Sequence, residues 1–269
     1  MARLEIDEGI QIHWEILGRG EPVALLNGVL MTTKSWNLQT SVLSRHYRLL
    51  LHDFRGQLLS DKPLQPWTMK DHARDLSALL DHLGIDRIHL VGTSYGGEVG
   101  MLFASTWPHR VKSLAVISSV TEIGPELDLA VSEWRQAALE DPETLYRVML
   151  PTTFSTEYVK SFPKVIEQGE ERLRSCPPDF FPAFARLVDT FRQLDITKQL
   201  ERIRCPTLVM VGEQDALKPP KYSRLIADRI SGSELVTIRE AGHAVILEKP
   251  SEVNATLLEF LGRNRESSN

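Results

Sequence analysis

Short apolar runs alternate with amphipathic stretches along most of the chain. Six of these runs are rich in Val, Ile and Leu and are bounded by turn residues, which is the pattern of strands buried on both faces. They are Pro22–Leu26, Arg48–Phe54, Arg87–Val91, Val111–Ile117, Thr207–Val211 and Glu234–Ile238. Helical patterns lie between most of them. The alternation predicts an α/β fold with a mostly parallel sheet covered by helices on both faces.

The clearest helical pattern runs from about Thr68 to Leu83. Thr68 can cap this helix, and Asp71 lies three residues later, where a capping box needs an acid. Apolar residues recur at helical spacing along one face, and Gly84 ends the pattern. The N-terminal segment, Arg3–Leu17, has instead the short alternation of an antiparallel hairpin, which we expect at the edge of the sheet.

The strand–helix alternation fails between about Val120 and Asp195, where helical patterns follow one another. We interpret residues 120–195 as a helical cap inserted into an α/β core of residues 1–119 and 196–269. The segment is rich in aromatic residues, which can wall an apolar pocket or fill the core of the cap itself. They are Phe154, Phe162, Phe180, Phe181, Phe184, Phe191, Trp134, Tyr146 and Tyr158.

The formal charge of −5 comes from acidic and basic residues interleaved along the whole chain, which disfavours nucleic acid as a partner. No apolar run approaches the roughly 18 residues of a membrane span, and the N-terminus carries acids where a signal peptide needs apolar residues. We therefore expect a soluble, cytoplasmic protein. Its two cysteines, Cys176 and Cys205, are too few and too far apart for a disulfide framework, so we expect free thiols.

The motif Gly92-Thr93-Ser94-Tyr95-Gly96 fits G-x-S-x-G, a sharp strand-to-helix turn that exposes a serine hydroxyl. Alone the motif is weak, because short combinations of Gly and Ser also arise by chance. Here it follows an apolar run and precedes a helical pattern from Tyr95 to Trp107, the flanks that the turn requires. The sequence therefore predicts Ser94 as a nucleophile.

A serine hydroxyl needs a base to remove its proton, and the base needs a carboxylate to orient it. Asp215 and His243 follow Ser94 in that order, each in a loop just after a predicted strand. The carboxyl ends of parallel strands carry the sites of open α/β sheets, so the three residues can meet there. Glu213 and Glu122 are alternatives for the acid. The other seven histidines do not have the placement of His243.

An oxyanion hole needs two backbone N–H groups directed at the developing negative charge. One should come from Tyr95, the residue after the nucleophile. The second should come from the loop after an early strand, Leu25-Leu26-Asn27-Gly28-Val29-Leu30, where Gly28 lets the backbone turn and Val29 presents its N–H. Without Ser94 downstream, Asn27-Gly28 would be interpreted as a simple turn.

At these residues the chain resembles the α/β-hydrolase superfamily over nearly its whole length. The resemblance rests on Gly92–Gly97, Val211–Asp215, Gly242-His243 and the stretch Asp53-Phe54-Arg55-Gly56 running on to Ser60-Asp61. It implies an eight-stranded, mostly parallel sheet with a helical cap, and no metal or organic cofactor. The chain departs from the family at Asn27-Gly28 and at Gln57-Leu58, where His-Gly is common. Asn27-Gly28 is similar to a smaller branch that includes an acyltransferase of rhamnolipid synthesis.

The function expected first is hydrolysis of a carboxylic ester with a small to medium acyl group, through an acyl-enzyme on Ser94. Lactone opening, thioester hydrolysis and acyl transfer on hydroxyacyl substrates use the same machinery and remain open. A serine at position 94 argues against the aspartate-dependent dehalogenases and epoxide hydrolases. A proline aminopeptidase needs acids in the cap, for which Glu170 and Glu171 are candidates, and a slow ligand receptor on the same fold also remains. The pattern does not predict an oligomeric state.

Overall fold

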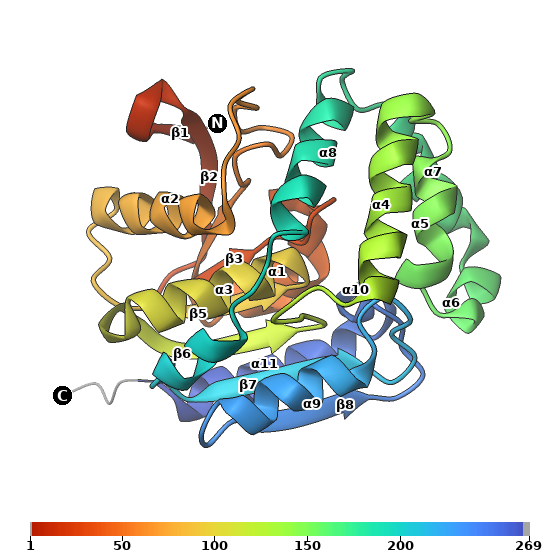
Figure 1. The fold of residues 1–269 in the computed structure, drawn as a ribbon. Coiled ribbons are helices and arrows are strands. Elements are labelled where there is room, and N and C mark those ends of the chain that lie inside the picture. Colours follow the sequence, from red (N-terminus) through yellow and green to blue (C-terminus); the bar gives the residue numbers. More distant parts are fainter. Residues whose placement is uncertain (1, 266–269) are drawn as a thin grey trace.

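The computed structural model describes residues 2–265, which form one eight-stranded sheet beside a group of helices (Figure 1). The strand order is β1-β2-β4-β3-β5-β6-β7-β8. Strands β3 to β8 run parallel to one another, and β1 and β2 form an antiparallel edge. The strands are β1 (Ala2–Glu5), β2 (Gln11–Leu17), β3 (Pro22–Leu26), β4 (Arg48–His52), β5 (Ile88–Thr93), β6 (Val111–Ile117), β7 (Thr207–Gly212) and β8 (Glu234–Ile238).

Helices cover both faces of this sheet and also extend beyond it (Figure 1). Their bounds are α1 (Asn37–Leu43), α2 (Met69–His82), α3 (Tyr95–Thr106), α4 (Pro125–Glu140), α5 (Leu145–Thr153), α6 (Thr156–Ser161), α7 (Pro163–Arg174), α8 (Phe180–Phe191), α9 (Pro220–Arg229), α10 (Val245–Glu248) and α11 (Pro250–Arg263).

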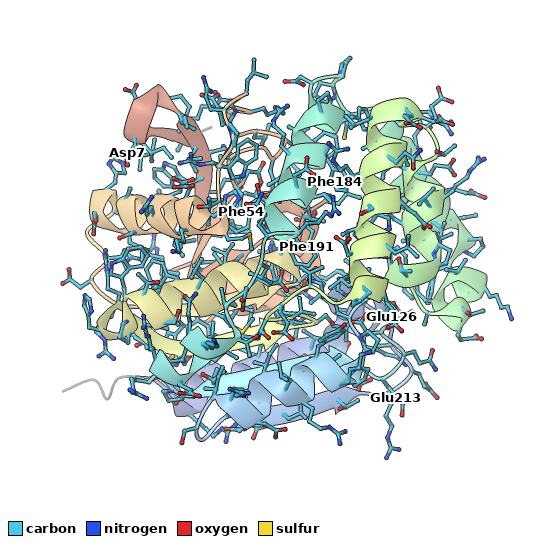
Figure 2. All side chains as sticks on the ribbon, viewed as in Figure 1. Asp7, Phe54, Glu126, Phe184, Phe191 and Glu213 are labelled. Carbon is cyan, nitrogen blue, oxygen red and sulfur yellow. The ribbon has the colours of Figure 1, made fainter. Side chains whose placement is uncertain are left out.

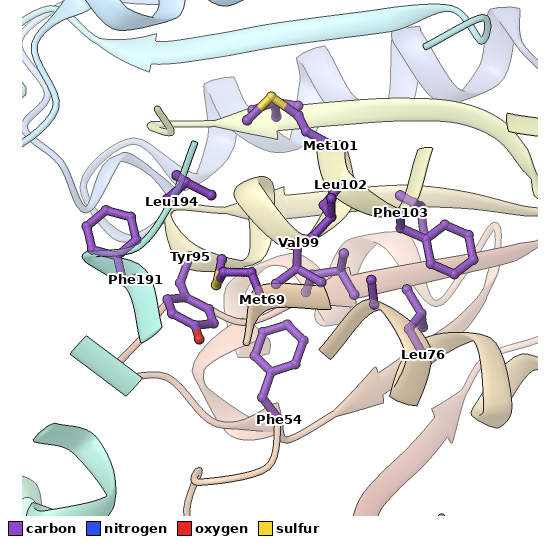
Figure 3. Packing of buried hydrophobic residues seen from close by; sticks show 14 of the residues in the cluster. Phe54, Met69, Leu76, Tyr95, Val99, Met101, Leu102, Phe103, Phe191 and Leu194 are labelled. Atoms are coloured by element: carbon purple, nitrogen blue, oxygen red, sulfur yellow. The ribbon is translucent and has the colours of Figure 1, made fainter. Parts of the chain in front are cut away.

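Successive side chains of the central strands point to opposite faces, so each strand contributes to two cores. On β3, Ala24 and Leu26 join the core beneath α2, α3 and α9, whereas Val23 and Leu25 join the core beneath α1, α10 and α11. Because both faces are buried, the strands read as continuous apolar runs in the sequence. Figure 3 shows part of the first core, in which α3 supplies Val99, Leu102 and Phe103.

The predicted α/β class and the eight-stranded, mostly parallel sheet are confirmed. All six predicted strands are present, with ends displaced by at most two residues. The N-terminal hairpin pairs antiparallel at the sheet edge, as predicted. Thr68 and Asp71 form the predicted capping box at the start of α2. Both cysteines are free thiols.

Between β6 and β7 the chain forms five consecutive helices, α4 to α8, with an isolated antiparallel bridge from Glu122 to Asp195 near their two ends. Figure 1 shows α4 to α7 gathered on one side of the molecule, beyond the strand ends that face them. Helix α8 packs closely against α4. We call residues 120–195 the helical segment. Within residues 2–265, no helix is long and apolar enough to cross a membrane.

Candidate active site

Ser94 lies at the turn between β5 and α3 in a backbone conformation that L residues rarely adopt, with φ 51° and ψ −120°. The turn is tight because the glycines on each side are packed against backbone. A Cβ on Gly96 would overlap the carbonyl oxygen of Leu26, and one on Gly92 would overlap that of Gly96. The requirement for glycine at these positions is therefore steric, and the turn presents the Ser94 hydroxyl at the carboxyl edge of the sheet.

The structure brings Ser94, His243 and Asp215 into one chain of hydrogen bonds. The Nε2 atom of His243 lies 3.0 Å from Ser94 Oγ, and its Nδ1 atom lies 2.9 Å from Asp215 Oδ2. Because an ionised carboxylate only accepts, Nδ1 carries the proton and Nε2 is left to accept from the serine hydroxyl. The imidazole is therefore held in the tautomer that can take the proton of Ser94.

The carboxylate of Asp215 is buried and fixed on both oxygens. Its Oδ1 accepts from the backbone N–H of Lys218 at 2.8 Å while Oδ2 faces His243. In the described part of the chain the two alternative acids are not bonded to His243, and each forms a hydrogen bond with another residue. Glu213 is exposed and accepts from the backbone N–H of Glu240, and Glu122 is exposed and accepts from the Thr197 hydroxyl.

Val29 and Tyr95 both line the small cavity that opens onto Ser94. A Cβ added to Gly28 would lie 3.7 Å from the Cβ of Ser94, so the loop after β3 passes directly beside Ser94. The backbone of this loop and the first turn of α3 therefore border the same space. Their N–H groups are candidates to bind a negatively charged oxygen there.

The two departures from the family pattern, Asn27 and Gln57, are partners in one buried network. Asn27 donates from Nδ2 to Gln57 Oε1 at 3.0 Å, and Gln57 donates from Nε2 to the carbonyl of Gly28 at 2.8 Å. Trp36 donates to Asn27 Oδ1 at 2.9 Å. Together these bonds fix the loop that carries Gly28 and Val29. Asn27 and Gln57 are therefore complementary in hydrogen bonding.

The cavity beside Ser94 has walls from the core and from the helical segment. Its lining residues are Val29, Ser94, Tyr95, Val131, Trp134, Val188, Phe191, Leu217 and Lys218. The free volume between these walls is small, enough for about one water molecule. Side chains of α4 and α8 therefore lie close to Ser94.

Of the nine aromatic residues singled out in the helical segment, Trp134 and Phe191 line this cavity. Phe180, Phe181 and Phe184 are buried in the hydrophobic core, where α8 packs on α4, and Figure 2 shows Phe184 and Phe191 along α8. Phe154, Tyr158 and Phe162 contact one another around α6. Most of the aromatic residues therefore serve the packing of the segment. Phe191 also contacts Tyr95, whose ring lies between those of Phe54 and Phe191 (Figure 3).

The sequence did not predict a buried ion pair that lies beside Ser94. Lys218 Nζ lies 2.9 Å from Glu98 Oε1 and 3.1 Å from Ser94 Oγ, and both charged side chains are at most 2% exposed. Burial raises the pKa of Glu98, although the Lys218 ammonium opposes the shift. A signal was present in the sequence, because Glu98 is the single Asp, Glu, Lys or Arg between positions 88 and 109. Lys218 follows Asp215 by three residues.

Comparison with known proteins places this chain in a family. The family model described as alpha/beta hydrolase fold matches residues 21–250. The chain belongs to the α/β hydrolase fold family. It is an α/β hydrolase with its Ser, Asp and His in the chain order of that fold.

This α/β hydrolase is similar to several proteins along all or nearly all of its length. It is 27% identical over 252 residues to RutD of Azorhizobium caulinodans, with 93% of this chain and 95% of RutD covered. MGS-M2, an alpha/beta hydrolase enzyme from a Medee basin deep-sea metagenome library, superimposes with a TM-score of 0.93 at 28% identity, with 100% of both chains covered. A thermophilic esterase from Thermogutta terrifontis gives 0.87 at 30% identity, over 99% of this chain and 100% of the esterase.

Within the part of the α/β hydrolase that the structure describes, no group of three or more His, Cys, Asp or Glu side chains could hold a metal ion. The acids proposed for an aminopeptidase do not gather at the cavity either. Glu170 pairs with Arg147 and Arg174 on α5 and α7. It therefore serves as a surface ion-pair partner.

Proposed function

We propose that this α/β hydrolase is a serine-dependent carboxylic ester hydrolase. The observation that carries the proposal is the hydrogen-bonded chain from Ser94 Oγ through His243 to Asp215, with spacings of 3.0 and 2.9 Å. A serine held in strained backbone, a base at hydrogen-bond distance and a buried carboxylate behind the base are the parts that acyl transfer needs. The similarity to an esterase over nearly the whole chain supports the same reaction class.

Ser94 Oγ attacks the ester carbonyl carbon while His243 Nε2 takes the hydroxyl proton. The carbonyl oxygen becomes an oxyanion that the N–H groups of Val29 and Tyr95 stabilise. Asp215 holds the imidazole and offsets its positive charge. His243 then gives the proton to the leaving alcohol, which departs and leaves the acyl group on Ser94. Water repeats the sequence on the acyl-enzyme and releases the acid.

The helical segment 120–195 acts in this proposal as a cap that holds the acyl group. Val131 and Trp134 of α4 and Val188 and Phe191 of α8 face Ser94 across the cavity. These apolar walls suit a hydrocarbon chain and exclude water from the reacting carbonyl. The small volume of the cavity favours short acyl groups unless the two helices separate.

The test is the rate of hydrolysis of p-nitrophenyl esters from acetate to decanoate by the native protein and by Ser94→Ala. We expect turnover that Ser94→Ala removes, and covalent labelling of Ser94 by a fluorophosphonate. The matched control is Ser105→Ala, in the same helix, whose hydroxyl bonds only the Leu102 carbonyl among the described residues. It should keep the activity. Turnover that survives Ser94→Ala would contradict the proposal.

The same experiment separates the alternatives. A lactonase opens a five- or six-membered lactone faster than it hydrolyses the open-chain ester of the same acid. An acyltransferase releases p-nitrophenol at a rate that rises with added alcohol. A receptor with slow turnover labels with fluorophosphonate but releases one equivalent of p-nitrophenol.

A further inference from the structure

Lys218 is an unusual neighbour for a serine nucleophile. Its ammonium lies 3.1 Å from Ser94 Oγ and 4.5 Å from the centre of the Phe191 ring, and it is the one charged side chain among the described residues that line the cavity. The remaining walls are mostly apolar. A substrate that reaches Ser94 must therefore lie against this cation.

The position of Lys218 is built into the core. Glu98, in the first turn of α3, is 0% exposed and accepts from both Lys218 Nζ and the backbone N–H of Val120, each at 2.9 Å. Val120 begins the helical segment, so one carboxylate joins the nucleophile helix, the loop after β7 and the start of that segment. The ion pair aims its ammonium at the reacting atoms.

Burying an ion pair at this position carries a free-energy cost. Removing each ion from water costs several kcal/mol, and well-packed apolar side chains of similar volume are often as stabilising or more so. Leu217 and Phe191 show that apolar packing is available at the same wall. The pair therefore indicates a role in which a charged donor beside Ser94 is used.

In the free enzyme the ammonium group of Lys218 already has partners for its N–H donors. One proton goes to Glu98, one to the Ser94 oxygen, and the cation also faces the Phe191 ring. When Ser94 Oγ bonds to an acyl carbon it becomes an ester oxygen, which is a weaker acceptor. One N–H of a buried ammonium then loses its partner, at a free-energy cost, unless the substrate supplies an acceptor.

Resting on the proposed function, we propose that Lys218 is a substrate-binding residue that donates a hydrogen bond to a neutral oxygen on the acyl group. The oxygen is a hydroxyl or carbonyl on the first or second carbon beyond the scissile carbonyl, because only those carbons remain near Nζ once the carbonyl carbon is bonded to Ser94. Glu98 is its positioning residue. Since Glu98 already balances the charge of Lys218, the subsite binds a neutral oxygen in preference to a carboxylate, which would add a second buried negative charge.

The test compares kcat/KM for ethyl butanoate with kcat/KM for each enantiomer of ethyl 2-hydroxybutanoate and ethyl 3-hydroxybutanoate. Hydrolysis of each ester is measured by the release of protons from the acid that forms. The preference is the ratio of the best hydroxy ester to ethyl butanoate within one variant, so overall losses of activity cancel. We expect a ratio of roughly 10 to 100 in the native enzyme, the range for a hydrogen bond to a charged donor.

The variant is Glu98→Gln/Lys218→Met, which removes both charges together and leaves no unpaired buried ion. Its ratio should fall to about 1. Glu98→Gln alone keeps an acceptor for Lys218 and should retain a ratio well above that of the double variant. Thermal unfolding of all three proteins verifies that they are folded.

Each outcome bears on the assignment. A native ratio near 1, or a native-like ratio in the double variant, overturns the assignment of Lys218 as a substrate-binding residue. Neither result contradicts the proposed ester hydrolase function. A preference for monoethyl succinate that depends on Lys218 overturns the neutral-oxygen assignment, since the subsite then binds an anion. No Ser94-dependent hydrolysis of any ester overturns the proposed function and this inference with it.

Discussion

The loops at the carboxyl edge of the sheet and the helical segment 120–195 are held in different ways. Helix α3, which begins at the Ser94 turn, buries every residue from Tyr95 to Ser105 in the core. Of the described residues, α6 buries none and α7 buries Leu173. Helix α8, in contrast, packs on α4 and its buried side chains join the same hydrophobic cluster as α3. The helix that begins at the Ser94 turn is therefore buried along nearly its whole length, whereas burial in the segment falls from α8 to α6 and α7.

One set of links joins the two regions next to His243. The backbone N–H of Ala244 donates to the Thr153 carbonyl at 2.8 Å, and the Ser155 hydroxyl donates to Glu248 at 2.6 Å. These bonds connect the loop of His243 and α10 to the junction of α5 and α6. The segment is therefore joined by hydrogen bonds to the loop that carries His243.

The largest effect should come from the loops at the carboxyl edge of the sheet, through Asp215→Asn. The amide presents an NH₂ group to His243 and favours the wrong tautomer, so we expect kcat for p-nitrophenyl butanoate to fall about 10⁴-fold. Glu213→Gln, an exposed acid two residues earlier, is the control and should change kcat less than twofold. An equal loss in both variants would mean that Asp215 does not orient the base.

The second effect is a loss of folding stability in acid, which arises from two buried histidines. Burial lowers the pKa of His52 to about 4, from an ordinary 6.5, and lowers that of His72 well below its ordinary value. Below about pH 6.5 the unfolded chain therefore binds protons at these two histidines that the folded protein does not bind. The contribution of these neutral histidines to the free energy of unfolding is fully present above about pH 6.5 and is lost as the pH falls towards 4. His52 alone accounts for a loss of about 3 kcal/mol.

Urea unfolding between pH 7.5 and 4.5 measures this loss. His52→Phe removes one titrating group, so its free energy of unfolding should fall less steeply with acid than that of the native protein. The ring of His52 lies 4.9 Å from that of Phe54, edge to face, so an aromatic replacement keeps the contact. Identical slopes for the two proteins would contradict a neutral buried His52.

The third effect lies at the loop that borders Ser94. Gln57→Leu removes the donor to the Gly28 carbonyl and leaves Asn27 short of an acceptor. We expect kcat to fall roughly 10- to 100-fold and stability to fall by about 1–3 kcal/mol. Asn254→Leu removes a largely buried amide on α11 that donates to the carbonyl of Leu38 on α1, and it should lower stability without lowering kcat. A kcat loss of the same size there would assign the Gln57 effect to stability alone.

The smallest effect should come from the helical segment. Val131→Phe on α4 fills part of the cavity, so the preferred acyl chain should shorten, with decanoate losing roughly 10-fold relative to acetate. Leu129→Phe, two residues earlier and 64% exposed, is the matched control. An unchanged chain-length profile in Val131→Phe would mean that the acyl group lies outside this cavity.

The sequence predicts the parts of this molecule that depend on local pattern. Strands buried on both faces leave continuous apolar runs, and Thr68 with Asp71 marks the start of α2 through a capping box that forms within four residues. Ser94, Asp215 and His243 could be singled out because each follows a strand in a loop of restricted composition. The assignment of residues 120–195 as a separate cap stays a prediction.

The features that the sequence did not predict depend on contacts between distant residues. Glu98 and Lys218 are 120 positions apart, and their ion pair forms only because the fold brings them together. Asn27 and Gln57 were recognised as departures, but their hydrogen bond appears only when two loops meet. The aromatic residues of the segment were ambiguous for the same reason, since packing between α4 and α8 decides which of them face Ser94.

The most direct test of the account is the rate of p-nitrophenyl butanoate hydrolysis by Ser94→Ala, by His243→Ala and by the double variant. If the two residues act as one unit, each single variant loses most of the activity and the double variant is little worse than either. Losses that multiply in the double variant would show that Ser94 and His243 act independently, and would contradict the proposed mechanism.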